Sequence, residues 1–431
     1  MNHPLQSTDY LHYRKGQPLT CLQQWREQGG EGLLVVDFQL QQYWLPDAPA
    51  LPLSAIYLWS QQRLSVSVTD QQLVDPGGLD AAALYDYWSE RCGFGCFVPG
   101  QPMNLQPVYI AKPWGQEIWY TGVEERGVCA FADAGKATAI PWLQAVMPDA
   151  AAGPADQALV LLKILDPSPE PVIGDLYFEL HEEKREVYVV TEVDKSAWPD
   201  GVGAIRYGFD PQYRRQFDSD AQFKAAYVKA VKDYERVRRQ LDALPAAEAA
   251  PETLQQAERT KRQAMNRFTY LRPLRVGDVV KVPLRLPHSL QHGVRTIEFQ
   301  TPVYERKILS FAQQVLTQDH WDTDQAAAIM DLEPPAEEAF ECLQKGPGLI
   351  VERIVDFDDF EVRRITLEAA ATIEDLAVPD YGVAMVVAGQ AELNEAQYPA
   401  GSALFMPGQR AFYRLSCAAK EPLVFLLALP R

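Results

Sequence analysis

The 431-residue chain is poor in positive charge, in histidine and in long apolar runs. Its 40 basic residues against 58 acidic ones leave a formal net charge of −18, so the surface repels nucleic-acid backbones and anionic membranes. No run of eighteen apolar residues occurs, and the first sixteen residues hold no apolar signal segment. We therefore expect a cytoplasmic protein with neither nucleic-acid nor membrane partners.

Cysteine is scarce as well, with six residues scattered along the whole chain. Cys92 and Cys96 form the only close pair, and no second pair exists to complete a zinc knuckle. This pattern argues against a disulfide framework and favours free thiols in a reducing compartment. We therefore assign the pair a structural role.

The chain nevertheless has the means to build several cores, because 47% of it is hydrophobic and a domain takes roughly 150 residues. Residues 1–105 read as a mixed α/β domain of unknown role, with strands at 33–45 and 54–68 and a helix at 79–91. We predict a barrel domain over 106–345 and a second barrel over 346–431. The fold class is then mainly β.

A helical insertion is predicted at about 209–272, where the hydrophobic period changes from two residues to about 3.6. Residues 252–271 form its second helix, and either Asp218 or Ser219 caps the first. The apolar stripe of the first helix consists of Phe223, Tyr227, Val231, Tyr234 and Leu241.

Two glycine–strand–proline segments share one spacing, which indicates two β-barrels of the same kind. His288 lies five residues after Pro283, and Phe412 lies five residues after Pro407. Such a segment resembles the second motif of cupin barrels, in which the last residue is a metal-binding histidine that points inward. The first barrel therefore keeps a candidate ligand, whereas the second, with phenylalanine, is expected to bind no metal.

The remaining candidate ligands lie in the stretch GDLYFELHEEKREVYVV. On a strand, Glu179 and His181 project to the same face, and Glu186 returns after a charged turn. Together with His288 they supply two imidazoles and two carboxylates, a suitable set for Zn²⁺. The alternatives are a solvated hairpin with no metal, a core role for His288, and His292 as the ligand in its place.

Four stretches, 112–119, 161–181, 184–190 and 287–306, resemble the type I phosphomannose isomerases. These are zinc-dependent cupin enzymes that interconvert mannose 6-phosphate and fructose 6-phosphate. The resemblance covers about residues 106–431. It implies one Zn²⁺ per chain, bound by Glu179, His181, Glu186 and His288. It also implies that Arg306, Glu298 and Lys184 are catalytic.

The chain departs from the pattern of that family at three positions. Glu179 replaces a glutamine ligand, Arg285 replaces the glycine before the last ligand, and Glu182 replaces a proline. The extra carboxylate is expected to tighten metal binding and to weaken the ion as a Lewis acid. For the phosphate of the substrate, we consider Arg285 and Lys163 as contacts.

The sequence therefore predicts a metal-dependent aldose–ketose isomerase, a monomer or homodimer, that acts on a hexose phosphate through a cis-enediol. The most plausible reaction converts mannose 6-phosphate to fructose 6-phosphate. One alternative is a non-catalytic sugar- or sugar-phosphate-binding protein derived from such an isomerase. Another is a different cupin enzyme, such as an iron oxygenase or an epimerase; oxygenases usually present two histidines and one carboxylate.

Overall fold

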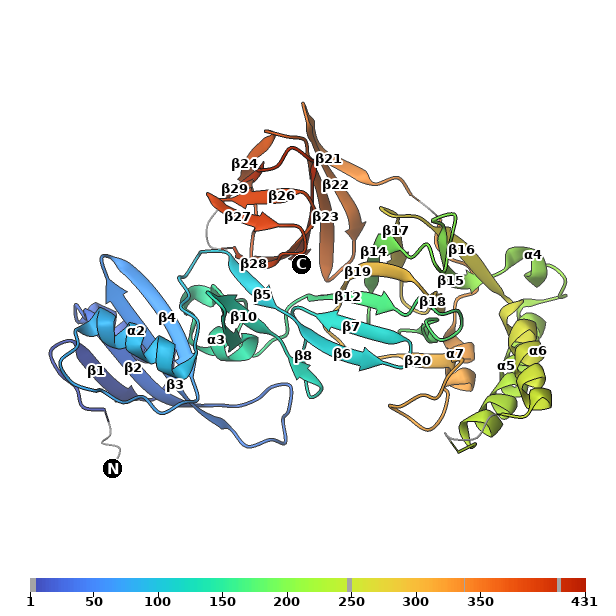
Figure 1. The fold of residues 1–431 in the computed structure, drawn as a ribbon, viewed down its shortest axis with the longest axis horizontal. Helices are drawn as coiled ribbons and strands as arrows, with labels where there is room; N and C mark the ends of the chain where they lie inside the picture. The colour runs from blue at the N-terminus through green and yellow to red at the C-terminus, as the bar shows by residue number, and fades with distance from the viewer. Residues whose placement is uncertain (1–4, 246–249, 337, 409–411) are drawn as a thin grey trace. The chain divides into compact units, whose positions relative to one another are not determined.

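The computed structural model describes residues 5–245, 250–336, 338–408 and 412–431, and within them the chain is mainly β, as predicted (Figure 1). It divides into two compact units, each assembled from segments that lie apart in the sequence. Unit 1 contains Met1–Val108, Trp119–Leu162 and Phe340–Arg431, and unit 2 contains Tyr109–Ile118 and Lys163–Ala339. The predicted three-domain division of the chain stays a prediction.

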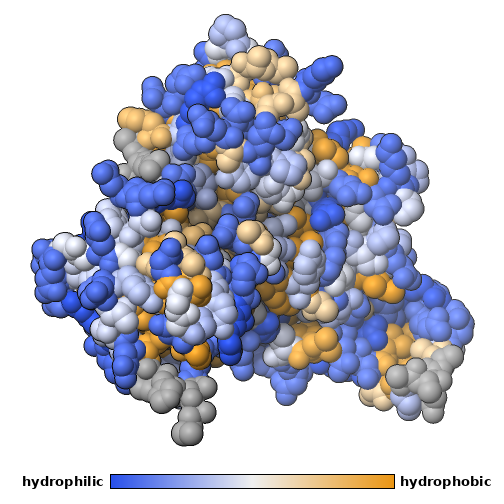
Figure 2. Space-filling model, turned by 60° about the vertical axis from the view of Figure 1, so that its left-hand side comes forward, coloured by the Kyte–Doolittle hydropathy of each residue, from blue (hydrophilic) through white to orange (hydrophobic). Residues whose placement is uncertain are grey.

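The surface and the helices have the polar character that the charged composition and the lack of long apolar runs predict. Hydrophilic residues cover most of the face seen in Figure 2, with apolar residues in small groups between them. In the described ranges, no helix combines the length and the apolar character needed to cross a membrane. All six cysteines carry free thiols.

The N-terminal part of unit 1 is a four-stranded sheet with helices, as predicted for a mixed α/β segment. Strand β1 runs parallel to β2, and helix α1 joins them, whereas β3 and β4 follow as antiparallel neighbours. Helix α2 begins after Asp80, whose carboxylate caps it, and ends at Gly93 in the left-handed conformation. The elements are β1 (Leu11–Lys15), α1 (Pro18–Glu27), β2 (Gly32–Leu40), β3 (Leu51–Ser60), β4 (Arg63–Thr69) and α2 (Ala81–Cys92).

The rest of unit 1 contains a nine-stranded and a four-stranded sheet that share one apolar core. In sheet order, the larger has β11 (Lys136–Ala139), β10 (Ala130–Asp133), β5 (Met103–Gln106), β28 (Ala403–Pro407), β25 (Tyr381–Ala388), β30 (Leu423–Pro430), β23 (Phe360–Leu367), β22 (Leu349–Asp356) and β21 (Glu341–Gly346). The smaller has β24 (Thr372–Leu376), β29 (Tyr413–Cys417), β26 (Gln390–Leu393) and β27 (Ala396–Pro399). Helix α3 (Ile140–Val146) follows β11.

One detail of the predicted second barrel is wrong. Phe412 was expected to point inward, but 55% of it is exposed, and the next residue, Tyr413, is the buried one. The hydroxyl of Tyr413 donates a hydrogen bond to the carbonyl oxygen of Pro407, which anchors the start of β29. Because side chains alternate along a strand, a shift of one residue exchanges the inner and outer faces. The absence of a metal from this barrel stays a prediction.

Unit 2 is a sandwich of two open sheets around a second core, to which both sheets contribute buried residues. The six-stranded sheet has β17 (Val279–Val282), β14 (Glu186–Val193), β19 (Val294–Gln300), β12 (Leu161–Pro167), β7 (Gly115–Trp119) and β6 (Val108–Lys112). The five-stranded sheet has β16 (Thr269–Leu274), β15 (Gly203–Phe209), β18 (His288–Leu290), β13 (Phe178–Leu180) and β20 (Lys307–Ser310). Both sheets are open at their edges.

The predicted helix pair lies in unit 2, as α5 (Asp220–Asp242) and α6 (Glu252–Asn266). Ser219 caps α5 by accepting a hydrogen bond from the backbone N–H of Gln222, so Ser219 rather than Asp218 is the N-cap. Four of the five predicted stripe residues are buried in the core of unit 2, whereas Leu241, near the C-terminal end, is half-buried. Helix α7 (Thr323–Ile329) packs against α5 and β20.

Candidate metal centre

The candidate ligands come together because the chain crosses between the two sheets of unit 2. Strand β13 pairs with β18 and β20, whereas β14, which follows after only five residues, pairs with β17 and β19. The predicted turn therefore links opposite sheets, and the alternative of a solvated hairpin is wrong. His181 and Glu186, which flank this link, are 1% and 2% exposed. Both side chains lie inside the sandwich.

Three of the four predicted ligands, Glu179, His181 and His288, converge on one point, and Glu186 lies against the two histidines. Glu179 lies opposite His288 in the register of β13 and β18. One ligand atom from each of Glu179, His181 and His288 lies within 4.8 Å of the others. Glu186 completes the group, with Oε1 at 3.5 Å from Nε2 of His181 and Oε2 at 3.1 Å from Nε2 of His288. Oε1 of Glu179 lies 4.0 Å from Nε2 of His181.

Hydrogen bonds at the far side of each imidazole determine which nitrogen faces this point. Nδ1 of His181 lies 2.9 Å from the carbonyl oxygen of Glu305, and Nδ1 of His288 lies 3.0 Å from that of Leu286. A carbonyl only accepts, so both Nδ1 atoms carry a proton, and in a neutral imidazole Nε2 then offers a lone pair. Such backbone bonds orient metal-binding histidines in general. A metal cation placed between these nitrogens and the carboxylates would satisfy both.

Two buried atoms at this point support a metal site directly. Nε2 of His181 and Oε2 of Glu179 are shielded from solvent and have no hydrogen-bond partner among the described residues. Leaving buried polar atoms unsatisfied is costly, so such atoms indicate a missing partner. Two imidazole nitrogens and two carboxylates suit Zn²⁺ or a similar divalent ion. The residues present therefore fit the metal that the sequence predicts.

Burial and neighbouring charges prepare the ligands for a cation. Burial, together with the ammonium of Lys184, lowers the pKa of His181, so its imidazole stays neutral. Burial alone would raise the pKa of Glu186, but Lys184 and the two histidines outweigh it and hold that pKa well below its usual range. His181 is therefore neutral and Glu186 is ionised at neutral pH, the states in which these two groups bind metal.

Two further side chains hold Glu186 in place. Nζ of Lys184 lies 2.5 Å from Oε1 of Glu186, and the hydroxyl of Tyr188 donates to Oε2 at 2.6 Å. Burial, with the charge of Glu186, raises the pKa of Tyr188 well above its usual value, so the phenol remains a donor. Tyr188 was not predicted as a site residue, because a tyrosine in an apolar strand is usually part of the hydrophobic core.

A second set of buried charges lies beside the ligands, and the sequence reveals only part of it. Nζ of Lys163 forms an ion pair with Glu298 at 3.2 Å, and Lys112 pairs with Glu117 at 3.3 Å. Burial alone would lower the pKa of Lys163, but Glu117, Glu298 and Glu186 outweigh it, so the ammonium stays charged. Because these carboxylates surround the 7%-exposed Lys163, it is a member of this buried cluster, and we withdraw it as a phosphate contact.

Glu117 is the clearest omission of the sequence analysis. It lies on β7 in the stretch KPWGQEIW and is 8% exposed. A glutamate between aromatic and apolar residues on a strand is the signal that would have revealed it. Buried ion pairs contribute little net stability compared with apolar residues of the same volume, whereas perturbed ionisable groups gather at functional sites. The cluster is therefore better explained by chemistry than by folding.

Arg306 lies next to the ligand set. Its Nε is 3.7 Å from Oε2 of Glu179, and its guanidinium stacks over the ring of Tyr177 at 4.5 Å from the centroid. An Nη atom donates to the hydroxyl of Thr317 at 2.8 Å. These three contacts hold the guanidinium beside the metal centre.

Arg285 and His292 are the remaining predicted candidates. The backbone N–H of Arg285 donates to the carbonyl oxygen of His181 at 2.7 Å, and its exposed side chain lies on a residue with φ of 64°. That left-handed conformation favours glycine, so the arginine is held there at a cost. His292 instead bonds Asp175 and stacks on Trp198, away from the four ligands. His288 is therefore the one of the two that lies in the site.

Comparisons with known proteins agree with the fold. No protein-family model matches the sequence, and no curated protein matches it either. The structure is similar to mannose 6-phosphate isomerase from Bacillus subtilis, with a TM-score of 0.56, 13% identity, and coverage of 76% of this chain and 99% of that one. A zinc-bound mannose 6-phosphate isomerase follows, with a TM-score of 0.53, 12% identity and coverages of 76% and 99%.

A variant of phosphomannose isomerase from Salmonella typhimurium has a TM-score of 0.50 and 13% identity, over 75% of this chain and 98% of that one. At such identities the likeness shows the fold alone. The predicted resemblance is confirmed at that level: the chain folds as these isomerases do. About a quarter of the chain has no counterpart in them.

Proposed function

From this shared fold and the buried ligand set, we propose that the protein is a metal-dependent aldose–ketose isomerase that acts on a hexose phosphate. The reaction best supported converts mannose 6-phosphate to fructose 6-phosphate. The observation that carries the proposal is the meeting of two imidazole Nε2 atoms and two carboxylates beside an arginine that pairs with one of those carboxylates. The expected location is the cytoplasm.

Isomerisation moves one proton between C1 and C2 and a second one between the two oxygens, through a cis-enediol. It needs a group that stabilises charge on the developing oxyanion and a group that transfers protons. A Zn²⁺ held by Glu179, His181, Glu186 and His288 would orient and polarise the substrate oxygens. The side chains around the ligands supply the other functions.

Arg306 is the proposed electrostatic stabiliser. Its contacts with Glu179, Tyr177 and Thr317 hold the guanidinium in one position before substrate arrives. A preorganised cation needs no reorganisation as charge develops, which is what makes such a group effective in the transition state.

Glu298 is the proposed proton-transfer group, with Lys184 as the alternative. Burial, followed by the charge of Glu186, raises the pKa of Glu298 well above its usual range, although Lys163 and Lys184 oppose the shift. A raised pKa makes a carboxylate a stronger base, which suits Glu298 to accept a proton from the substrate and to return it. The ammonium of Lys163 keeps Glu298 in place during the cycle.

Arg285 is the proposed contact for the substrate phosphate. It lies beside the ligand His181 through a backbone hydrogen bond, and its side chain is exposed. Lys184 and Lys307 are paired with Glu186 and Glu182, which leaves Arg285 the better placed of these three cations to bind an anion.

A direct assay tests the function. The purified protein, supplied with Zn²⁺, is expected to convert mannose 6-phosphate to fructose 6-phosphate, followed by coupled detection of the ketose product. Removal of the metal by a chelator should abolish turnover, and addition of Zn²⁺ should restore it. If no hexose phosphate is isomerised while zinc is bound, the alternative of a non-catalytic sugar-binding protein replaces the proposal.

Replacing Glu179 by glutamine tests the effect of the additional carboxylate. We expect Glu179→Gln to bind zinc more weakly and to isomerise at least as fast when saturated with metal, because a neutral ligand leaves the ion a stronger Lewis acid. Metal affinity is measured by competition with a chelating dye, and turnover at saturating zinc. Loss of turnover in the fully loaded variant would show that the carboxylate of Glu179 acts in the reaction itself.

A further inference from the structure

A row of polar side chains crosses the four-stranded sheet of unit 1 at the end where the parallel strands β1 and β2 finish. The register places Lys15 opposite Asp37, Asp37 opposite Ser54, and Ser54 opposite Thr69. Residues opposite each other in a sheet share a face, so the four side chains form one continuous row.

The same face of the sheet is apolar in the rows nearer helix α2. There Leu33, Val35, Ile56 and Leu58 pack with Trp88 of the helix in one buried cluster. The polar row is the point at which this apolar face ends. Helix α2 covers the apolar rows, so the change to polar residues marks the part of the sheet that this helix leaves uncovered.

A cavity of about 720 Å³ lies over this polar row. Residues 70–73, which follow β4, form a wall that carries Asp70, and the buried side chains of Leu53 and Leu73 line the cavity. Its volume lies within the range of roughly 300–1,000 Å³ that is usual for small-molecule sites. The carboxyl ends of parallel strands are also where such sites occur in open α/β sheets.

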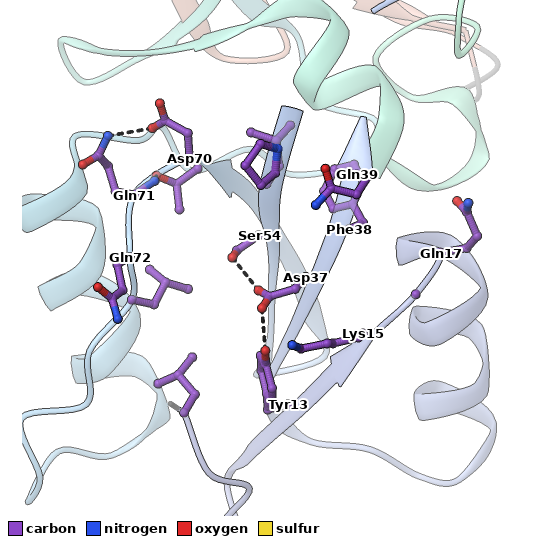
Figure 3. A pocket seen from close by; sticks show the side chains of 16 residues that line it. Tyr13, Lys15, Gln17, Asp37, Phe38, Gln39, Ser54, Asp70, Gln71 and Gln72 are labelled. Carbon is purple, nitrogen blue, oxygen red and sulfur yellow. Dashed lines mark hydrogen bonds between the residues drawn. The ribbon is translucent and has the colours of Figure 1, made fainter. Parts of the chain in front are cut away.

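The central carboxylate of the cavity is held in one orientation. Figure 3 shows Asp37 between Tyr13 and Ser54. The hydroxyl of Tyr13 donates to Oδ2 of Asp37 at 2.5 Å, and that of Ser54 donates to Oδ1 at 2.7 Å. Burial, followed by the hydrogen bond to Asp37, raises the pKa of Tyr13 to about 12, so the phenol remains a donor. Fixed polar groups of this kind characterise preorganised binding sites.

Amide side chains form much of the polar lining of the cavity. Gln17, Gln39, Gln71 and Gln72 line the cavity. Among the described residues, the side chains of Gln17 and Gln39 and the ammonium of Lys15 form no hydrogen bond or ion pair. An amide both donates and accepts, as does each hydroxyl group of a sugar.

We propose that this cavity binds a small neutral polyhydroxylated molecule, a monosaccharide or short glycan, at a site separate from the metal centre. The lining chemistry selects this class. Lys15 is the one cation there against Asp37 and Asp70, so a phosphate or other anion is disfavoured. The amides and the fixed carboxylate match adjacent hydroxyls. The proposal does not depend on the isomerase activity.

Calorimetric titration of the full-length, zinc-loaded protein with mannose, glucose and fructose tests the site. At least one of these sugars is expected to bind with a Kd on the order of 1 mM. Gln17→Ala/Gln39→Ala should weaken it about ten-fold, because two hydrogen-bonding groups are lost. Gln24→Ala, which removes an exposed glutamine of helix α1 outside the cavity, is the matched control and should bind as the wild type does.

Three results would contradict the site: no binding of any of the three sugars, equal binding by the double variant, or binding lost only in Arg306→Ala. The last would assign the binding to the metal centre. Isomerase turnover measured on the same variants should be unchanged by Gln17→Ala/Gln39→Ala. A failure of the cavity site is thereby distinguished from a failure of the proposed activity.

Discussion

Replacing His181 or His288 by alanine is expected to remove the metal while the fold remains. The wild-type protein should carry about one divalent ion per chain, zinc in preference to others, given its two imidazoles and two carboxylates. Each variant deletes a ligand whose Nε2 faces the site, so the loss of metal affinity should exceed the ~10–100-fold cost of removing a residue that only orients a ligand. Elemental analysis gives the occupancy, and circular dichroism reports the fold.

His292→Ala is the matched control, because His292 lies four residues from His288 and bonds Asp175 instead of facing the ligands. It should retain its zinc. Full occupancy in both ligand variants would overturn the assignment of the metal centre. If His292→Ala loses the metal and His288→Ala retains it, His292 and not His288 is the fourth ligand.

Arg306→Ala is expected to keep its metal and its melting temperature but to lose on the order of 10²–10³ in turnover, the usual effect of removing one preorganised oxyanion donor. The change in KM should be smaller, since the contact matters most in the transition state. Arg306→Lys should recover only part of the rate, because a point charge lacks the planar fork that contacts Glu179 and Thr317. Steady-state kinetics with mannose 6-phosphate gives both constants.

Lys307→Ala serves as the control for charge, since it removes a cation one residue further on whose partner is Glu182 at the edge of the site. Its turnover should stay close to that of the wild type. If wild type isomerises a hexose phosphate and Arg306→Ala does so equally well, Arg306 has no part in catalysis. Equal losses of turnover in Arg306→Ala and Lys307→Ala would show that the positive charge near the site, and not the guanidinium of Arg306 in particular, supports catalysis.

The local sequence pattern was sufficient to predict which side chains share a face, because a single strand or helix determines that arrangement. The strand period predicts that Glu179 and His181 share a face, and the structure places them together. The helix period likewise predicts four buried stripe residues of α5, and of the two predicted caps, Asp218 and Ser219, the structure selects Ser219. Both rest on backbone geometry within one segment, which the residues of that segment control.

The pairing of strands that lie far apart in the chain could not be predicted from the sequence. The partners of each strand depend on hydrogen bonds that form across the whole unit. The turn after His181 reads locally as a hairpin, yet the chain crosses there from one sheet to the other and carries Glu186 into the interior. Proximity in the sequence likewise does not distinguish His288 from His292; only the direction of β18 does. The resemblance to a family supplied what local pattern could not.

Charge burial is the other property that only the tertiary structure decides. Lys163 and Glu298 lie 135 positions apart in the chain and pair inside the sandwich, and Glu117 joins them from a third strand. Three strands must pack before these charges leave water, so no single segment reveals them. In the N-terminal sheet, Lys15, Asp37 and Ser54 are unremarkable as sequence. They become a row only when strand register aligns them, because register is a property of paired strands and not of any one strand.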